Sequence, residues 1–411
     1  MWRERISGLH NERQQNRLWR NRIVSESGQG PLIWIDGREF LNFCSNDYLG
    51  LASRPELAQA AKRAGEQFGV GSGAAHLICG HHALHHQLEE RLADWLGAEK
   101  ALLFSTGYMA NLAVAQAFLK SSDLLFQDRL NHASLIDAGR TAPARMVRYQ
   151  HADANALRSK IERHLSRLDT DAATVHPGLM IATDSVFSMD GDVAPLNELH
   201  ALARQHQSLL WVDEAHGLGV LGDQGRGALA AHQIAPTENV FLMGTLGKAF
   251  GSFGAFVAGD QIWIDHLIQF ARTYIYTTAL PPMVAATSLA ALQLIQHEPQ
   301  LQSQLKQNIE SFRQLLQSKS DRLFSCLKPS LTPIQPLVIG SPEATLAASQ
   351  HLREQGILVS AIRPPTVPNG ESRLRITISA THTTEQIQQL VDALLTSDIE
   401  SMIDSSGGPH E

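Results

Sequence analysis

The chain has 411 residues, 43% of them hydrophobic, and a formal net charge of −7, so it can bury a large core in more than one domain and lacks an overall basic field for nucleic acid. No apolar run approaches the ~18 residues of a membrane span, which argues against a membrane partner. The three cysteines are scattered outside any C-x-x-C spacing, which excludes a disulfide framework and favours a reducing, cytoplasmic location.

Residues 1–54 are predicted to form a polar helix followed by a hairpin. The first twenty residues place isolated apolar side chains on a polar background. The stretch "LIWIDGREFLNF" then contains two short strands about Asp36-Gly37, a dipeptide typical of a two-residue hairpin turn. The local basic run "RLWRNRIV" is too polar for a secretory signal, which needs an uninterrupted apolar stretch.

Residues 55–280 are predicted to form a large α/β domain. The stretches "PELAQAAKRAGEQF" and "LHHQLEERLADWL" have helical apolar spacing. The expected strands are the short apolar runs "KALLFST", "DLLFQD", "GLMIATDSV", "SLLWVDEA", "NVFLMG" and "GAFVAG". Their continuous apolar character is what strands covered on both faces require. Strands that alternate with helices predict a mainly parallel sheet.

Residues 281–400 are predicted to form a smaller α+β domain. Two long helices, "PPMVAATSLAALQLIQ" and a Gln-rich segment around 300–318, come first. The stretches "IQPLVIG", "GILVSAIRPP" and "SRLRITISA" follow as strands, with one helix among them and one after them. Residues 401–411, which include "SSGGPHE", are predicted to be a disordered tail.

The residues that end the apolar runs carry the candidate chemistry, because ligands of open α/β sheets bind beyond the carboxyl ends of the strands. Lys248 stands in the glycine-rich stretch "GTLGKAFGSFG", where an amine short of water and counter-charge becomes a nucleophile. Asp213 and His216 stand at the end of one expected strand. Gly107 stands between another expected strand and the helix after it, where free backbone N–H groups can bind a phosphate. With Thr245, this set fits pyridoxal phosphate: an amine for the aldehyde, a carboxylate for the ring nitrogen, and donors for the phosphate.

Other interpretations compete for the same residues. A solvated surface position for Lys248 and a capping role for Asp213 stay open when each residue is taken alone. A Walker A loop needs glycine and a hydroxyl residue where the chain has Leu242 and Ala249, so that interpretation fails. The stretch "FGVGSGAAHL" resembles a dinucleotide fingerprint but follows a helix rather than a strand.

A histidine cluster in "HHALHH" raises the question of a metal. His81 and His85, like His82 and His86, are four residues apart, a helical spacing that zinc could use. No acidic or cysteine partner is evident nearby, so no metal is assigned. We expect these histidines to lie on a polar helix face or at an interface.

Taken together, the motifs resemble those of the α-oxoamine synthase family of fold-type-I pyridoxal phosphate enzymes. The resemblance runs over essentially the whole chain, through "LNFCSNDYLGL", "FSTGYMAN", "DRLNHASLIDA", "DSVFSMDGDVAPL", "VDEAHGLGVLGDQGRG", "GTLGKAFGSFG" and "RLRITISATH". It implies a large domain with a mainly parallel sheet of seven strands, a smaller C-terminal α+β domain, pyridoxal 5′-phosphate as the cofactor, and a homodimer.

Within that family, "ARTYIYTTALPP" and "AIRPPTVPNGESRLR" most resemble the biotin-pathway branch. This branch implies an acyltransferase that condenses L-alanine with a pimeloyl thioester, on coenzyme A or acyl-carrier protein, with loss of carbon dioxide. The alternatives are glycine C-acetyltransferase or another α-oxoamine synthase. More distant alternatives are a non-catalytic subunit of this fold and a DNA-binding regulator, for which the short basic start supplies no helix-turn-helix module.

The resemblance also assigns roles by motif. The catalytic residues would be Lys248, as the cofactor-binding lysine and proton shuttle, His132, stacked on the ring, and Asp213, at the ring nitrogen. The cofactor-binding residues would be Gly107, Tyr108, Ser188, Asp213, His216, Thr245 and Lys248. The substrate-binding residues would be Arg20, Asn46, His132, Thr366 and Arg375. The guanidinium of Arg375 suits the planar carboxylate of an amino acid.

The chain departs from the family in the glycine-rich stretch "GSGAAHLICGHH". Ala75 and His76 stand where a serine and often an arginine are usual, and His81 stands where an aromatic residue is common. In relatives this segment reaches the active site across a dimer interface. Its contribution to acyl-chain binding is therefore left open, whereas the cofactor residues show no such loss.

Overall fold

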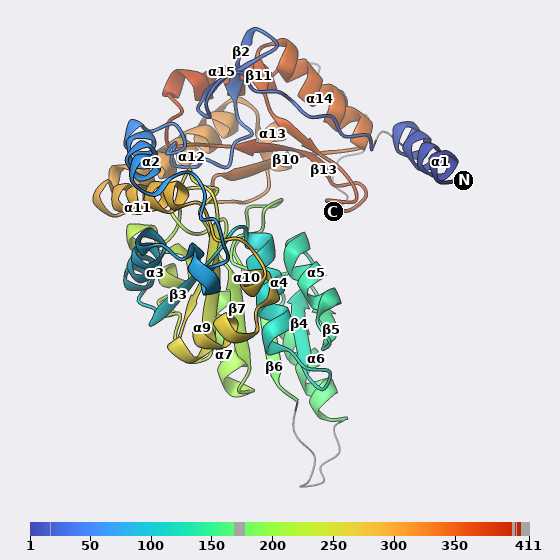
Figure 1. Ribbon diagram of the computed structural model, residues 1–411. Helices are drawn as coiled ribbons and strands as arrows, with labels where there is room; N and C mark the ends of the chain where they lie inside the picture. The colour runs from blue at the N-terminus through green and yellow to red at the C-terminus, as the bar shows by residue number, and fades with distance from the viewer. Residues whose placement is uncertain (17, 168–176, 397–398, 400, 404–411) are drawn as a thin grey trace.

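The computed structural model describes residues 1–16, 18–167, 177–396, 399 and 401–403. At its centre lies a seven-stranded sheet of order β3-β9-β8-β7-β6-β4-β5, in which every neighbouring pair is parallel except the two that involve β9 (Figure 1). The strands are β3 (Lys100–Phe104), β4 (Leu124–Asp128), β5 (Arg145–Tyr149), β6 (Leu179–Asp184), β7 (Leu209–Asp213), β8 (Val240–Thr245) and β9 (Ala255–Gly259). The α/β fold with a mainly parallel sheet is therefore confirmed.

Strand β5 is the one strand of this sheet that the apolar runs did not predict. Its sequence "RMVRY" has two arginines among its apolar residues, and Tyr149 is the one buried residue of the strand. The other strands of the sheet are buried along most or all of their length, because helices cover both faces. The β5 pattern suits its place at the edge of the sheet.

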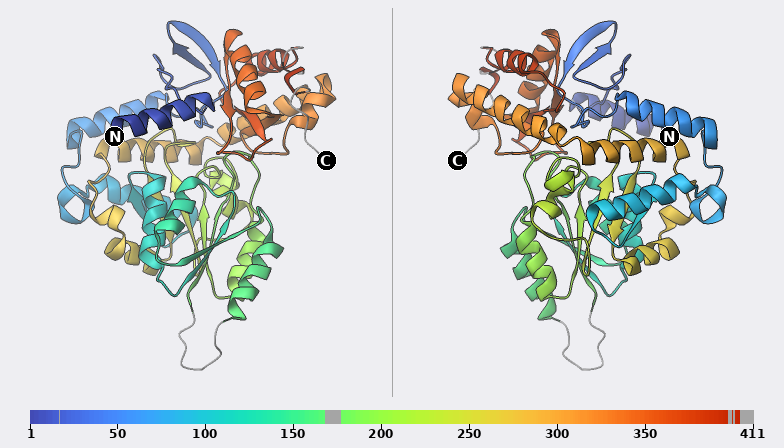
Figure 2. Two further views of the ribbon diagram at one scale, coloured as in Figure 1. Left: turned by 90° about the vertical axis from the view of Figure 1, so that its right-hand side faces the viewer. Right: turned by 90° about the vertical axis from the view of Figure 1, so that its left-hand side faces the viewer.

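Helices flank the central sheet on both sides (Figure 2). On one side α4 and α5 pack through Val114 and Leu135 into an apolar cluster with Trp211 of β7. On the other side α6 packs through Leu157 into the main core, with Phe126 of β4. The helical segments of this part are α2 (Pro55–Phe68), the π-helical turn η1 (His76–Gly80), α3 (Ala83–Leu96), α4 (Gly107–Phe118), α5 (Ala133–Thr141), α6 (Ala154–Leu165), α7 (Leu196–Gln205), the short turn η2 (Asp223–Gly225), α8 (Gly227–Ala231), α9 (Gln261–Phe270) and α10 (Arg272–Ile275).

The C-terminal part forms two small three-stranded sheets with helices, as the expected α+β pattern indicates. One sheet has the antiparallel order β10-β13-β12, and the other has the order β1-β2-β11. The strands are β1 (Leu32–Ile35), β2 (Arg38–Asn42), β10 (Ile334–Gly340), β11 (Ile357–Leu358), β12 (Ser360–Ile362) and β13 (Ser372–Thr377). The helices are α11 (Pro282–His297), α12 (Gln300–Lys319), α13 (Asp321–Cys326), α14 (Pro342–Glu354) and α15 (Thr384–Leu394).

The N-terminal hairpin pairs with the C-terminal part of the chain. β1 and β2 are antiparallel about Asp36-Gly37, where both residues have positive φ, and β11 adds in parallel to β2. The division of the chain after residues 54, 280 and 400 stays a prediction. The predicted disordered tail needs one correction, because residues 401–403 are helical and Ile403 is buried in the apolar core. Residues 404–411 lie outside the described residues.

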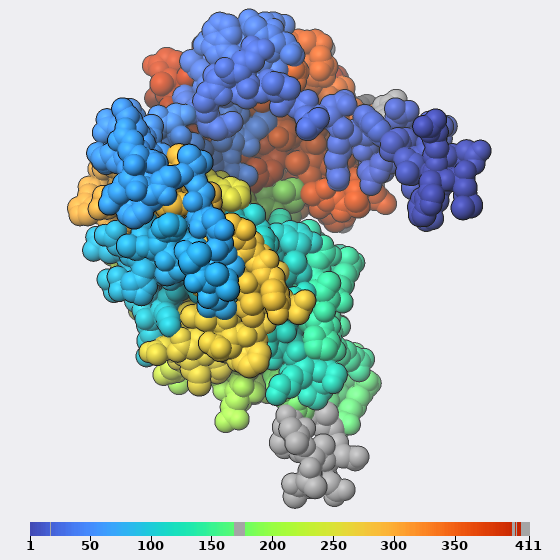
Figure 3. Space-filling view, viewed as in Figure 1, coloured from blue at the N-terminus to red at the C-terminus, as the bar shows by residue number. Residues whose placement is uncertain are grey.

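The first helix, α1 (Trp2–Gln15), has no buried residue. It projects from the body of the molecule on the face seen in Figure 3, consistent with the polar helix expected from the sequence. Across the described ranges, we find no helix with the length and hydropathy needed to cross the lipid bilayer.

The small β10-β13-β12 sheet is tied to the loop that leaves β6 at its carboxyl end. Arg375 of β13 donates through Nε to the Ser188 carbonyl oxygen at 2.7 Å. Ser330 and Thr332 donate to the Gly191 carbonyl oxygen at 2.9 and 3.1 Å. These contacts bring residues of the C-terminal part to the strand ends where the candidate chemistry lies.

Candidate active site

Lys248 follows β8 and is half-buried near the carboxyl edge of the central sheet. Its Nζ lies 2.8 Å from His216 Nε2, and His216 Nδ1 lies 2.6 Å from the hydroxyl of Tyr48. Burial lowers the pKa of Lys248 to about 8, although the charges of Asp213 and Asp184 favour the ammonium form. A substantial fraction of the amine is therefore neutral near physiological pH, as a nucleophile or proton acceptor requires.

His216 is buried, and no acidic side chain is hydrogen-bonded to its ring among the described residues. Burial, followed by the positive charge of Lys248, holds the pKa of His216 well below its usual value. The imidazole is therefore neutral, and it connects the Tyr48 hydroxyl to the Lys248 amine. Through these two contacts Tyr48, in the loop before α2, fixes the position of the Lys248 amine.

Asp213 ends β7 and is buried, at 4% exposure. One carboxylate oxygen accepts from the Asn111 side-chain amide at 2.8 Å, and the other accepts from the Ala215 N–H at 3.0 Å. The same Asn111 amide donates to the hydroxyl of Ser134 at 2.8 Å. This carboxylate is therefore held in one orientation by neutral donors, with its charge uncompensated by any of them.

His132 is the N-cap of α5 and joins the same hydrogen-bond network through Ser134. Its Nδ1 accepts from the Ser134 N–H at 3.2 Å and lies 2.7 Å from the Ser134 hydroxyl, which already accepts from Asn111. The hydroxyl proton therefore points at Nδ1, and the neutral ring carries its own proton on Nε2. Burial lowers the pKa of His132, although the charge of Asp213 opposes the shift. The ring is a neutral N–H donor.

Asp184 ends β6 beside Asp213 and is buried. It accepts from the His132 backbone N–H at 2.9 Å through one oxygen, whereas its other oxygen has no hydrogen-bond partner among the described residues. Burial, followed by the charge of Asp213, raises the pKa of Asp184 well above its usual value. The two buried carboxyl groups thus repel each other at this edge of the sheet, and a cation beside Asp213 would relieve that repulsion.

The start of α4 offers free backbone donors. The first N–H groups of a helix have no acceptor within it, and here the Thr106 side chain caps only the Met109 N–H, at 3.2 Å. The N–H groups of Gly107 and Tyr108 remain available, at the positive end of the helix dipole. Thr245, at the end of β8, is half-buried and adds a hydroxyl. The Tyr108 hydroxyl is bonded to Asp137 and lies outside this group.

Arg375 and Asn46 come together although 329 positions separate them, as the resemblance implied. The guanidinium donates to the Asn46 side-chain oxygen at 3.2 Å and to the Thr377 hydroxyl at 3.1 Å. Asn46 also accepts from the Tyr48 hydroxyl at 3.2 Å. Ser188 meets Arg375 through its carbonyl oxygen rather than its side chain. No acidic side chain is hydrogen-bonded to this guanidinium among the described residues.

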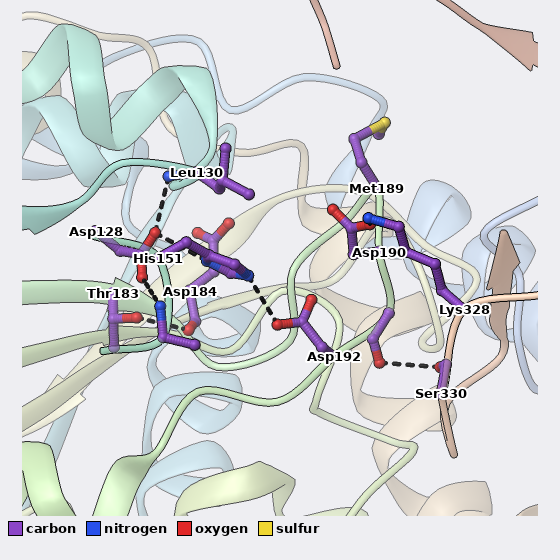
Figure 4. Close-up of polar contacts among 12 residues, drawn as sticks. Asp128, Leu130, His151, Thr183, Asp184, Met189, Asp190, Asp192, Lys328 and Ser330 are labelled. Carbon is purple, nitrogen blue, oxygen red and sulfur yellow. Dashed lines mark hydrogen bonds and ion pairs between the residues drawn. The ribbon is translucent and has the colours of Figure 1, made fainter. Parts of the chain in front are cut away.

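Charged residues also link the loops that follow β4, β5 and β6 to one another (Figure 4). His151 stands between Asp128 and Asp192, with ring nitrogens 3.0 and 2.9 Å from their oxygens. Asp190 of the same loop lies 2.8 Å from the ammonium of Lys328 and is also bonded to Arg373. Burial alone would lower the pKa of His151, but the two aspartates raise it to about 10.

The His151 bridge predicts a pH-dependent stability. Because the pKa rises from 6.5 unfolded to about 10 folded, the contribution is fully present below pH 6.5 and is lost as the pH rises through about 10. We expect the free energy of unfolding to fall by roughly 2 kcal/mol more between pH 7 and pH 10 in the parent protein than in His151→Gln, after discounting for solvent screening. Urea unfolding at both pH values measures this difference. Equal changes in the two proteins would contradict it.

The residues present fit pyridoxal phosphate. The repulsion between Asp213 and Asp184 favours a cation such as a protonated ring nitrogen, and among the described residues one buried oxygen of Asp184 and that of Asn111 have no hydrogen-bond partner. Lys248 supplies an amine for an aldehyde, and the Gly107 and Tyr108 N–H groups supply donors for a phosphate.

Comparisons with known proteins agree with this geometry. Residues 38–394 match the family model described as aminotransferase class I and II. A protein of Methylococcus capsulatus named 8-amino-7-oxononanoate synthase is 52% identical over 92% of this chain and 94% of its own, and one of Hahella chejuensis with the same name is 47% identical over 93% of both. The chain belongs to the 8-amino-7-oxononanoate synthases, within the class I and II aminotransferase family.

Two solved structures of related enzymes are similar to this chain over most of their length. A serine palmitoyltransferase from S. paucimobilis, with bound PLP-myriocin, is 28% identical, with a TM-score of 0.87 and 98% of both chains covered. An 8-amino-7-oxononanoate synthase from Francisella tularensis is 31% identical, with a TM-score of 0.72, and the match covers 89% of this chain and 99% of that one.

Two residues that the resemblance assigned to substrate are exposed and have no hydrogen bond or ion pair to Lys248 among the described residues. Arg20 is exposed and lies in a hollow with the α1 residues Ile6 and Leu9, on the projecting N-terminal part. Thr366 is exposed in the loop before β13. Their roles stay predictions.

Sequence reasoning missed several residues of the 8-amino-7-oxononanoate synthase site. Tyr48, Asn111, Ser134 and Asp184 contact the expected residues directly. Two signals could have found some of them. Asp184 ends an expected strand, and Asn111 is one helical turn after Gly107, hence on the same face of α4.

Proposed function

We propose that this chain condenses L-alanine with a pimeloyl thioester, giving 8-amino-7-oxononanoate, carbon dioxide and a free thiol in biotin biosynthesis. Pyridoxal 5′-phosphate is the cofactor. The observation that carries the proposal is the Lys248 amine, with a pKa of about 8, held by His216 at the strand edge where Asp213 stands. The relatives that bear this name, at 46–52% identity over more than 90% of the chain, support it.

The cofactor, when bound, withdraws electrons from the α-carbon of the amino acid, and the protein directs where protons and charges go. Asp213 keeps a ring nitrogen protonated, because its buried carboxylate has only neutral donors as partners. Lys248 accepts a proton from the substrate α-carbon through Nζ and returns it after carbon dioxide leaves. His216, held by Tyr48, keeps that amine in place.

The remaining residues bind and orient the cofactor and the substrates. The Gly107 and Tyr108 N–H groups and the Thr245 hydroxyl hold a phosphate at the start of α4. His132 donates through Nε2 toward the thioester carbonyl oxygen, which gains negative charge when the carbon–carbon bond forms. Its tautomer is set by the Ser134 hydroxyl on the opposite nitrogen. Asn46 and Arg375 bind the alanine carboxylate.

Replacement of Arg375 by lysine tests the carboxylate site. The lysine keeps the charge but loses the planar pair of donors and the contact with Asn46. We expect KM for L-alanine to rise by roughly 10–100-fold, the value of one or two charged hydrogen bonds, with a smaller change in kcat. Steady-state kinetics with varied alanine measures this. A KM within about twofold of the parent value would remove Arg375 from the alanine site.

The function itself is tested with purified holoenzyme. The visible absorbance is titrated with L-alanine and then with glycine, and product formation is measured for alanine with pimeloyl-CoA and for glycine with acetyl-CoA. We expect spectral change and product with the alanine pair. Turnover with the glycine pair alone would replace this proposal with glycine C-acetyltransferase activity.

Partners and location belong to the same proposal. The pimeloyl group arrives on coenzyme A or on an acyl-carrier protein. The enzyme acts as a homodimer in the cytoplasm, in keeping with the family resemblance and the scattered cysteines. Light scattering of the holoenzyme tests the dimer.

A further inference from the structure

We propose that His81, His86 and Glu89, at the start of α3, form a zinc site separate from the Lys248 site. The sequence analysis assigned no metal because no acidic partner was evident near "HHALHH". The fold supplies that partner in Glu89. His86 and Glu89 are three residues apart on α3, so their side chains share one helix face, and His81 precedes the helix by two residues.

The three side chains already converge. One nitrogen or oxygen of each lies within 4.8 Å of the others, and His81 Nε2 is 3.9 Å from Glu89 Oε2. Tetrahedral zinc with bonds of about 2.1 Å sets its ligand atoms ~3.4 Å apart. Small side-chain movements, of the order of 1 Å, therefore close the site around the ion.

The ligand atoms are oriented by bonds on their opposite sides. Glu89 Oε1 accepts from the Leu103 N–H at 2.9 Å, which leaves Oε2 for the ion. His81 Nδ1 lies 2.8 Å from His76 Nδ1, which leaves Nε2 for the ion. Ligand histidines usually make such a bond through the second nitrogen. His76, the residue that departs from the family pattern, thus acts as a positioning residue.

The protonation states suit a cation. Burial raises the pKa of Glu89 to about 8, although the charge of Lys100 opposes the shift, and a bound cation would lower it. Burial, followed by the nearby His86, lowers the pKa of His81, so its ring is neutral and can offer a lone pair. Two imidazoles and one carboxylate form a ligand set that zinc uses with a fourth position open.

A neighbouring group of histidines is less suited to the ion. His76, His81 and His85 also lie close together. However, His85 Nε2 is bonded to the Leu280 carbonyl oxygen at 2.5 Å, and its Nδ1 accepts from the His82 N–H at 2.9 Å. Both nitrogens of His85 are therefore committed, and it cannot bind a metal without losing a buried hydrogen bond.

There is room for a fourth ligand. A cavity of about 470 Å³ opens beside the three residues and is also lined by Tyr274 and Lys100. A water molecule or a small anion can enter it and complete the tetrahedron. The ion would join the glycine-rich segment before α3 to the helix and, through Glu89, to the backbone of edge strand β3.

Calorimetric titration of the tag-free holoenzyme with zinc chloride tests the site. We expect one ion per chain, and at least ~10-fold weaker binding in His86→Gln and Glu89→Gln. His297→Gln, which alters an exposed histidine at the end of α11, is the matched control and should bind as the parent does.

The outcomes separate cleanly. The His86 side chain is 66% exposed, so His86→Gln should fold and decides the question even if Glu89→Gln does not fold. Absence of zinc binding in the parent overturns the proposal, as does unchanged affinity in His86→Gln or in a folded Glu89→Gln. Among the described residues, the contacts of the His86 side chain are with Glu90 and His81 and not with the residues around Lys248, so turnover of His86→Gln measured without zinc should equal that of the parent.

Discussion

Lys248→Ala is expected to lose at least ~10³-fold in turnover, together with the visible absorbance of the cofactor bound through that amine. The amine lies 2.8 Å from His216 Nε2, and alanine supplies neither a nucleophile nor a proton acceptor in its place. Absorbance spectra and steady-state assays of the purified variant measure both losses.

A surface lysine provides the control for that variant. Lys306 on α12 is exposed and pairs weakly with Glu310, so Lys306→Ala should retain the activity and spectrum of the parent. A Lys248→Ala protein that kept both turnover and absorbance would remove the lysine from the mechanism and with it the proposed function.

Asp213→Asn is expected to lower kcat by roughly 10²–10⁴-fold while the protein stays folded. The new amide can still accept from the Ala215 N–H. Its NH₂ group would face the donor of Asn111, but Asn111 can flip, because its oxygen has no hydrogen-bond partner among the described residues. The variant therefore removes a buried charge and leaves one buried donor, the flipped Asn111 amide, without a partner, which costs some stability but not the fold.

Thermal unfolding and steady-state kinetics together separate an effect of Asp213→Asn on folding from its effect on catalysis. Thermal unfolding close to that of the parent, combined with the loss of kcat, supports a carboxylate that keeps the ring nitrogen protonated. If turnover stayed within about threefold of the parent, Asp213 would be a structural cap rather than part of the chemistry.

Much of the fold was predictable from local patterns. Continuous apolar runs identified six of the seven strands of the central sheet, since strands covered on both faces need no polar alternation. The edge strand β5 escaped, because its arginines break that pattern. Parallel strands that alternate with helices bring their carboxyl ends to one edge, so Asp213 and Lys248 were expected to meet there.

The substrate side of the site was less predictable. Arg375 and Asn46 were assigned by resemblance alone, and the fold brings them together at 3.2 Å. Arg20 was assigned in the same way, yet it lies on the projecting N-terminal part. Nothing in the composition or periodicity of the chain distinguishes these two arginines. The difference lies in the packing of β13 against the loop after β6.

The sequence by itself determined the α/β class, the order of the elements, and which strands end in candidate catalytic residues. It could do so because local patterns of apolar, glycine and turn residues indicate burial and backbone preference. Only the tertiary structure decided which atoms meet. The Tyr48 hydroxyl contacts His216, which is 168 positions away in the chain, and Oε2 of Glu89 lies 3.9 Å from His81 Nε2. Such pairs depend on helix rotation and strand register to within about an ångström, which long-range packing sets and no short stretch of sequence encodes.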